Sequence, residues 1–155
     1  MRTARSGLTL VELVIVVLLV GILGRIAIPS YQTFVYRARA AQALGDLNTV
    51  RLAAYEYNVD TNAWPADQNP GEVPPELVPY LSPEFTFDRD HYRLDWENWV
   101  MPDGTPKHPD TGVLLGVSIT TEDEQLGGAL EKLVGSEAAH WTLADNYTFI
   151  IASAN

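Results

Sequence analysis

The hydrophobic pattern begins with one long apolar run. It covers residues 8–28, "LTLVELVIVVLLVGILGRIAI". The positions that interrupt it are Thr9, Glu12, Gly21, Gly24 and Arg25. As a helix rising 1.5 Å per residue, the run would span about 31 Å, the thickness of the hydrocarbon core of a bilayer. The pattern therefore predicts a helix that crosses a membrane.

The flanks of this run predict its orientation. Arg2 and Arg5 precede it, and positive charge tends to keep a flank in the cytoplasm, so residues after Pro29 should lie outside. An ordinary secretory signal has a shorter apolar core followed by a small-x-small cleavage site, to which "AIPSY" is a poor match. A signal anchor that is never cut remains an alternative.

A second pattern follows the membrane segment. Apolar residues stand at positions 36, 40, 43, 47, 50, 54 and 57, in alternating steps of four and three. This spacing places them on one face of an amphipathic helix. We expect residues 30–60 to continue the membrane helix and to pack this face on the protein's own sheet.

The rest of the chain, residues 61–155, predicts a globular head. Six prolines between 65 and 83 favour a long surface connection. Strand patterns follow at 91–100 and 112–120, with Asp103-Gly104 as a turn signal between them. Next come a capping box at Thr121–Glu124 with a short helix up to Gly135, and a hairpin around Asp145-Asn146. The expected fold class is α+β: one long N-terminal helix against a small antiparallel sheet of roughly four strands.

The charge is unevenly distributed between these parts. The net charge is −10, yet residues 1–52 hold six arginines against Glu12 and Asp46. An acidic head argues against a nucleic-acid partner, because phosphate binding needs clustered Lys and Arg. The absence of cysteine excludes disulfides, thiolate metal sites and a cysteine nucleophile.

Glu12 is the anomaly of the membrane segment. A carboxylate in hydrocarbon costs about 2.5–3.5 kcal/mol on insertion scales and usually has a partner. Arg25, thirteen residues on, would lie about 20 Å away along a helix. Either the partner comes from another chain, or Glu12 lies among the headgroups.

The segment "GLTLVEL" with the run behind it closely resembles the prepilin signature of type IV pilins and type II secretion pseudopilins. That signature is a glycine, a hydrophobic residue and then T-L-[IV]-E-L. The resemblance implies that a membrane peptidase cuts after Gly7 and that Leu8 receives a methylated amine. It also implies that Glu12 pairs with the N-terminal amine of a neighbouring subunit. Pro29 matches a proline that bends or locally melts the helix in the family.

Beyond the helix, Tyr57, Asp60, Trp64 and Pro65 resemble a Y-x-x-D-x-G-x-[YW]-P block of major pseudopilins and some type IV pilins. Asn62 stands where the block has glycine. Asparagine tolerates a left-handed backbone better than most residues, so we expect the turn to be kept.

Candidate chemistry in the head is weak. The three histidines, His91, His108 and His140, have no metal-binding spacing, and the common catalytic motifs are absent from the sequence. The family resemblance implies calcium in major pseudopilins. The available oxygens here are those of Asp103, Asp110, Glu122, Asp123 and Glu124, although none matches a family motif. A solvated acidic face is favoured over a calcium site, and no cofactor is expected.

These observations predict a structural subunit of a type IV pilus-like filament, not an enzyme, either a major pseudopilin of type II secretion or a type IV pilin. The expected parts are a leader (1–7), a membrane or filament-core helix (8–29), its amphipathic continuation (30–60) and the head (61–155). The chain would be a single-pass inner-membrane protein that assembles into a periplasmic or extracellular filament.

The partners implied are further copies of the chain, minor pilins or pseudopilins, the prepilin peptidase and methyltransferase, and an inner-membrane assembly platform. Two alternatives remain open. One is an uncleaved, membrane-anchored binding domain outside the cytoplasm, and the other is a membrane-anchored hydrolase.

Overall fold

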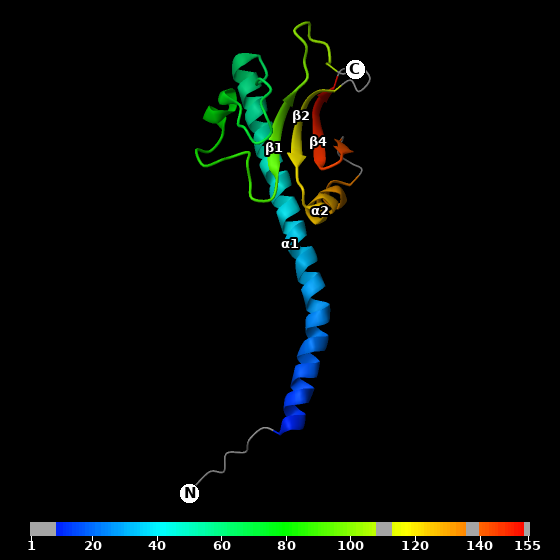
Figure 1. The fold of residues 1–155 in the computed structure, drawn as a ribbon. Coiled ribbons are helices and arrows are strands. Elements are labelled where there is room, and N and C mark those ends of the chain that lie inside the picture. Colours follow the sequence, from blue (N-terminus) through cyan, green and yellow to red (C-terminus); the bar gives the residue numbers. More distant parts are fainter. Residues whose placement is uncertain (1–8, 108–112, 136–139, 154–155) are drawn as a thin grey trace. The chain divides into compact units, whose positions relative to one another are not determined.

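The structure is a computed structural model, which describes residues 9–107, 113–135 and 140–153 (Figure 1). Two compact units divide the chain, residues 1–35 and 36–155, and each is described by itself. The elements in chain order are α1 (Leu10–Thr61), a 3-10 helix η1 (Pro75–Tyr80), β1 (Arg93–Asn98), β2 (Val113–Thr120), α2 (Glu124–Val134), β3 (His140–Leu143) and β4 (Asn146–Ser153).

In the first unit, the described residues are helical from Leu10 onward. Their large apolar side chains are exposed among the described residues: between Leu10 and Ile28 the exposed fraction runs from 51% at Ile15 to 78% at Leu10. α1 has the length and composition of a membrane-spanning helix, and its most apolar window contains no buried residue.

In the second unit, the later turns of α1 contribute one face to the hydrophobic core. The predicted stripe is confirmed: its buried members are Ala40, Ala43, Leu47, Val50 and Ala54, with Tyr36 and Tyr57 partly buried at its ends. Several of these side chains are alanines, and small residues allow a helix backbone to approach its neighbours closely. The second part of α1 is therefore a member of the core of the head.

The sheet is antiparallel throughout, in the order β1-β2-β4-β3. Alternation along each strand sends one set of side chains into the core shared with α1. Two rows of the register form this set: Leu94, Ile119 and Tyr147 in one, and Trp96, Val117 and Phe149 in the other. The α+β class with a long N-terminal helix and four antiparallel strands is thereby confirmed.

The start of α2 differs from its prediction. The capping-box pattern assigned the N-cap to Thr121, but the N-cap is Asp123, whose carboxylate accepts hydrogen bonds from the N–H groups of Gln125 and Leu126. Thr121 is engaged at the end of β2 instead. Its hydroxyl donates to the carbonyl of His91 and its N–H donates to the carbonyl of Asp145. These tertiary contacts hold Thr121 outside the helix, so the cap moves two residues on.

The turns follow the sequence signals closely. The β3–β4 hairpin is confirmed, with Ala144 (φ 55°) and Asp145 between the strands. Gly104 (φ 82°) lies in the connection between β1 and β2. The proline-rich connection contains only the short η1 helix, which places Leu77 in the core.

Asn62, directly after α1, adopts the left-handed backbone that the sequence predicted, with φ at 54°. Residues without a short polar side chain lose about 1–2 kcal/mol in this conformation. We therefore expect Asn62→Val to lower the free energy of unfolding by about that amount, and Asn62→Gly to change it by only a few tenths. Denaturant unfolding of the full chain in detergent, followed by tryptophan fluorescence, measures both. Equal effects of the two substitutions would contradict the assignment.

Candidate functional site

The first turn of α1 holds the Glu12 carboxylate in a reciprocal cap. Glu12 Oε2 accepts hydrogen bonds from the Thr9 N–H at 2.8 Å and from the Thr9 hydroxyl at 2.7 Å. The Glu12 N–H donates back to Thr9 Oγ1 at 3.3 Å. This is a capping box, in which the two residues satisfy each other's exposed groups. It fixes the carboxylate at the N-terminal end of the helix, where the helix dipole also favours a negative charge.

The predicted cleavage and leader residues, Arg2, Arg5, Gly7 and Leu8, lie outside the described residues. The geometry at Thr9 and Glu12 therefore defines the position of the Glu12 carboxylate. Its pairing with the N-terminal amine of a neighbouring subunit stays a prediction. An amine at the helix start would find a fixed anionic acceptor there.

Pro29 lies inside α1, as the sequence placed it. Proline has no N–H, so the carbonyl of Arg25, four residues earlier, loses its usual helical donor. Two hydroxyl groups bond the backbone around this position. Ser30 Oγ donates to the carbonyl of Ile26 at 3.1 Å, and Thr33 Oγ1 donates to the carbonyl of Pro29 at 3.0 Å. Such side-chain bonds often accompany a bend or a weakened turn.

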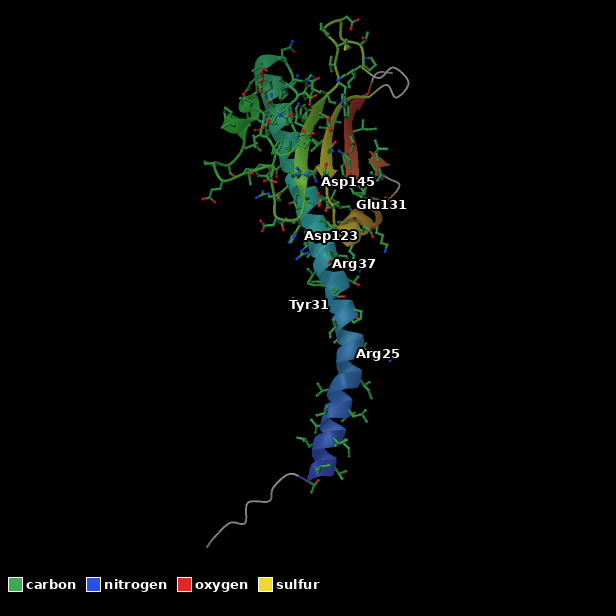
Figure 2. All side chains as sticks on the ribbon, in the orientation of Figure 1. Arg25, Tyr31, Arg37, Asp123, Glu131 and Asp145 are labelled. Atoms are coloured by element: carbon green, nitrogen blue, oxygen red, sulfur yellow. The ribbon has the colours of Figure 1, made fainter. Side chains whose placement is uncertain are left out.

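Arg25 is the basic residue of the apolar segment, and its side chain projects from α1 in Figure 2. It is exposed, and within the residues that the structure covers it forms no ion pair. The apolar surface of this unit thus carries two charged groups, Glu12 near its start and Arg25 near its end.

The block of Tyr57, Asp60, Trp64 and Pro65 connects the end of α1 to the rest of the head. Its first half does so through contacts with a tyrosine of η1. The rings of Tyr57 and Tyr80 meet edge to face, with centroids 6.0 Å apart. The Tyr80 hydroxyl donates to Asp60 Oδ2 at 2.9 Å. Both contacts join the last turns of α1 to the end of η1.

The second half of the block joins the chain to the sheet. The Trp64 ring lies between Tyr55, edge-on at 5.6 Å, and Trp96 of β1, stacked at 6.3 Å. The Pro65 carbonyl accepts hydrogen bonds from Trp96 Nε1 at 3.1 Å and from Asn98 Nδ2 at 2.7 Å. The four block residues therefore have structural contacts that account for them without any ligand.

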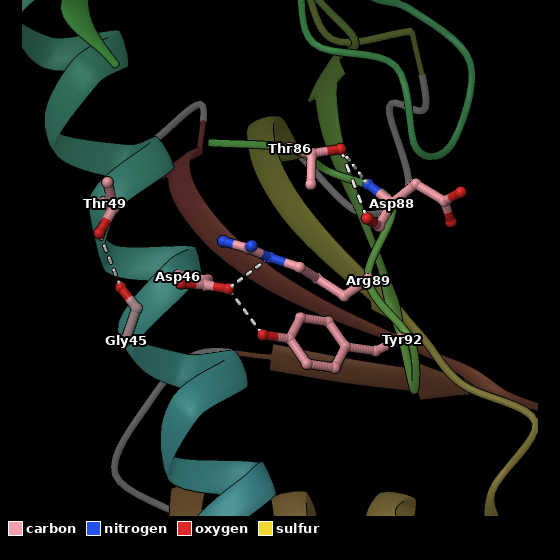
Figure 3. A network of polar contacts seen from close by, with 7 residues as sticks. All are labelled: Gly45, Asp46, Thr49, Thr86, Asp88, Arg89 and Tyr92. Atoms are coloured by element: carbon pink, nitrogen blue, oxygen red, sulfur yellow. Dashed lines mark hydrogen bonds and ion pairs between the residues drawn. The ribbon is translucent and has the colours of Figure 1, made fainter. Parts of the chain in front are cut away.

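A polar contact that the sequence did not predict ties the middle of the second part of α1 to the loop before β1 (Figure 3). Asp46 Oδ2 accepts a hydrogen bond from the Tyr92 hydroxyl at 2.7 Å and forms an ion pair with Arg89 Nε at 3.0 Å. The Arg89 guanidinium also lies over the Phe85 ring, 5.0 Å from its centroid. Burial, together with the hydrogen bond to Asp46, raises the pKa of Tyr92 well above its ordinary value.

The calcium candidates do not come together. Asp103 Oδ1 accepts from the N–H and hydroxyl of Thr105, and Asp123 caps α2. Glu122 is exposed, and Asp110 lies outside the described residues. Across residues 9–107, 113–135 and 140–153, no group of three or more His, Asp or Glu side chains is arranged to hold a metal ion.

The face of the sheet away from the α1 core carries a buried carboxylate instead. Asp95 is 5% exposed, opposite Ser118 on β2, which in turn faces Thr148 on β4. Asp95 Oδ1 has no hydrogen-bond partner among the described residues. Burial, with the nearby carboxylates of Glu97 and Asp67 adding to it, raises the pKa of Asp95 to about 8. The strand pattern at 91–100 did not single out Asp95, because alternation with Leu94 and Trp96 does not show whether the second face of a strand is covered.

Glu97 and Asp67 lie in the same acidic group. Burial raises the pKa of each, opposed by the hydroxyl of Ser118 at Glu97 and by the Asn98 N–H at Asp67. Lys107 also acts against the shift at both. Lys107 therefore offsets part of the effect of burial on both carboxyl groups.

Taken together, an uncovered apolar helix with a capped carboxylate at its start, and an α+β head built on its later turns, define a pilin-like protein. Several known proteins are similar to part of the chain. The chain is 39% identical over 67 residues to the fimbrial protein EcpC of Eikenella corrodens, covering 43% of this chain and 44% of that protein. It is 37% identical over 73 residues to the type IV major pilin protein PilE of Neisseria gonorrhoeae, covering 47% and 44%. The chain is thus similar to type IV pilins over about half of its length.

A further relative is the type IV major fimbrial protein FimA of Dichelobacter nodosus, 40% identical over 53 residues, which are 34% of each chain. The matched part is less than half the length of each of these relatives. No protein-family model and no solved structure matches the chain. The relatives' names are those of structural proteins, in agreement with the expectation that the chain is not an enzyme.

The raised pKa of Asp95 predicts a pH-dependent stability. The ordinary pKa of an aspartate is about 3.9. Between that value and about 8 the folded state keeps a proton that the unfolded state has released. The free energy of unfolding should therefore fall as the pH rises through this window. The two pKa values alone would give about 5.5 kcal/mol, and solvent screening at a partly accessible carboxyl reduces the fall to a few kcal/mol.

Asp95→Asn keeps a neutral polar side chain and should flatten this fall, so that the variant is more stable than the wild type at pH 8 and above. Denaturant unfolding of the full chain in detergent between pH 5 and pH 9 measures it. Glu84→Gln, a change at an exposed carboxylate, is the matched control and should leave the curve unchanged. A variant that loses stability equally at every pH would refute a protonated Asp95.

Proposed function

We propose that the chain is a structural subunit of a type IV pilus-like filament, a type IV pilin or a major pseudopilin of type II secretion. The observation that carries the proposal is the apolar surface from Leu10 to Ile28, which no described part of the chain covers. Such a surface needs lipid or other apolar helices around it. Before assembly a bilayer supplies the lipid, and in a filament further copies of the chain supply the apolar helices.

The proposal includes processing. The prepilin peptidase cuts after Gly7, and Leu8 becomes the methylated N terminus. The cut places a new ammonium group one residue before Thr9, next to the turn in which the Glu12 carboxylate is fixed. In an apolar bundle an ammonium and a carboxylate are each costly alone and tolerable as a pair. Pairing between neighbours would therefore set their axial stagger.

The location follows from the same reasoning. The precursor is a single-pass inner-membrane protein with its head outside the cytoplasm, and the assembled filament is periplasmic or extracellular. Its partners are other copies, minor pilins or pseudopilins, the peptidase and methyltransferase, and an assembly platform in the inner membrane. The names of the relatives favour a pilus, while the block from Tyr57 to Pro65 resembles one of major pseudopilins and some type IV pilins.

The test of this function is the mass of the N-terminal peptide from cells, combined with filament yield. The wild type should give a peptide that starts at Leu8 and carries one added methyl group. Glu12→Ala and Glu12→Gln should be cut but should yield few filaments, because both remove the charge that pairs with the neighbour's amine.

Thr9→Ala is the matched control for the capping box. It removes the hydroxyl that caps the helix but keeps the Glu12 carboxylate, so it should still assemble. Normal assembly of Glu12→Gln would exclude the charge pair. A peptide that starts at Met1 would reject the processing and favour the uncleaved, membrane-anchored binding domain.

A further inference from the structure

The second unit also leaves one face of α1 uncovered. Leu52, Tyr55 and Val59 follow each other in steps of three and four, on one side of the helix. Their exposed fractions are 60%, 39% and 82%. An open hollow of about 440 Å³ lies over this face, lined by Leu52, Tyr55, Glu56, Val59, Asp60 and Tyr80. We call this hollow, with its lining residues, the helix-end hollow.

Two carboxylates, those of Glu56 and Asp60, line the helix-end hollow, and the Arg51 guanidinium lies over the Tyr55 ring, 6.0 Å from its centroid. Glu56 and Asp60 lie one turn apart in the last turns of α1, and the last turn holds no basic residue. Like charges at this spacing repel, and negative charge at a helix C-terminus also opposes the helix dipole. The hydrogen bond to Asp60 raises the pKa of Tyr80, and the charge of Glu56 adds to this, so both carboxylates act on the same place. A group that fits here is apolar and carries a cation.

The first unit of the chain carries such a group. Arg25 stands among exposed isoleucines: Ile22 is 53% exposed, Ile26 68% and Ile28 60%. By contrast, the Arg39 guanidinium lies over the Tyr36 ring of its own copy, 5.5 Å from its centroid, and the neighbouring Ala40 is buried in the core of the head. The exposed isoleucines together with the cation of Arg25 thus favour residues 22–28 as the complement of the helix-end hollow.

We propose that residues 22–28 of one copy dock in the helix-end hollow of another copy, with Arg25 between Glu56 and Asp60. This contact rests on the proposed filament function and specifies it. It is a different contact from that of Glu12, which involves the start of the helix.

The contact also gives the Arg25 guanidinium an anionic partner. An arginine that moves from a membrane boundary into a packed bundle loses hydration and requires an anionic partner. Two carboxylates at the rim supply it, and guanidinium groups bind carboxylates through several donors at once. The docking therefore removes an uncompensated charge from each of the two surfaces.

The absence of cysteine in the chain allows a direct test. Ile26→Cys together with Val59→Cys should give covalent multimers on a denaturing gel after mild oxidation of sheared filaments. A bond between copies raises the mass on the gel, whereas a bond within one copy does not. Ile26→Cys together with Leu133→Cys is the matched control, since Leu133 is 48% exposed on α2, outside the hollow, and should give monomers.

Charge exchange gives the second arm. Arg25→Glu and Glu56→Arg should each reduce filament yield about fivefold, the upper range for an exposed ion pair, and the double variant should restore it. The side chains are exposed, so unfolding of the three variants should match the wild type. The docking would be overturned if filaments formed without the 26–59 disulfide, or if the double variant did not recover the wild-type filament yield. Either result would leave the filament function standing. A wild type that forms no filaments would overturn the filament function itself.

Discussion

The apolar surface between Leu10 and Ile28 is the constraint on which the rest of the molecule depends. Hydrophobic side chains of this size are stable only where water is excluded, and the described chain offers them no cover. The same helix behaves differently farther on, where its alanine-rich face enters the core of the head. One element therefore needs two kinds of surroundings: its second part packs on its own sheet, and its first part needs an apolar environment that the described chain does not supply.

The head depends on α1 as much as α1 depends on its surroundings. Ala40, Ala43 and Val50 are fully buried members of the core, so the sheet has no complete hydrophobic layer without the helix. Polar and aromatic contacts fix this packing, through Asp46 in the middle and Trp64 at the end. A change in the second part of α1 is therefore also a change in the core of the head.

Much of the fold could be predicted from periodicity, because the helix stripe and the strand alternation are local patterns. Asn62 was predictable as well, since its backbone preference is a property of the residue itself. The cap of α2 was not, because Thr121 is held by residues distant in the chain. Asp46 and Asp95 were missed for the same reason: their partners approach from other elements, and alternation alone does not tell a covered face from a solvated one.

The segment after α1 affects whether the sheets of two neighbouring heads can pair edge to edge. An exposed strand edge is a template on which another chain can add a strand, and this leads to aggregation. At β1 part of that edge is already occupied, because the Gly71 N–H donates to the Leu94 carbonyl and the Leu94 N–H donates to the Phe87 carbonyl. The Pro65 carbonyl also accepts the side-chain N–H groups of Trp96 and Asn98, which holds the chain at Pro65 beside β1. At the other edge, β3 is only four residues long. Heads held side by side at high local concentration are thus protected from joining their sheets, and their association is left to helices and surface charge.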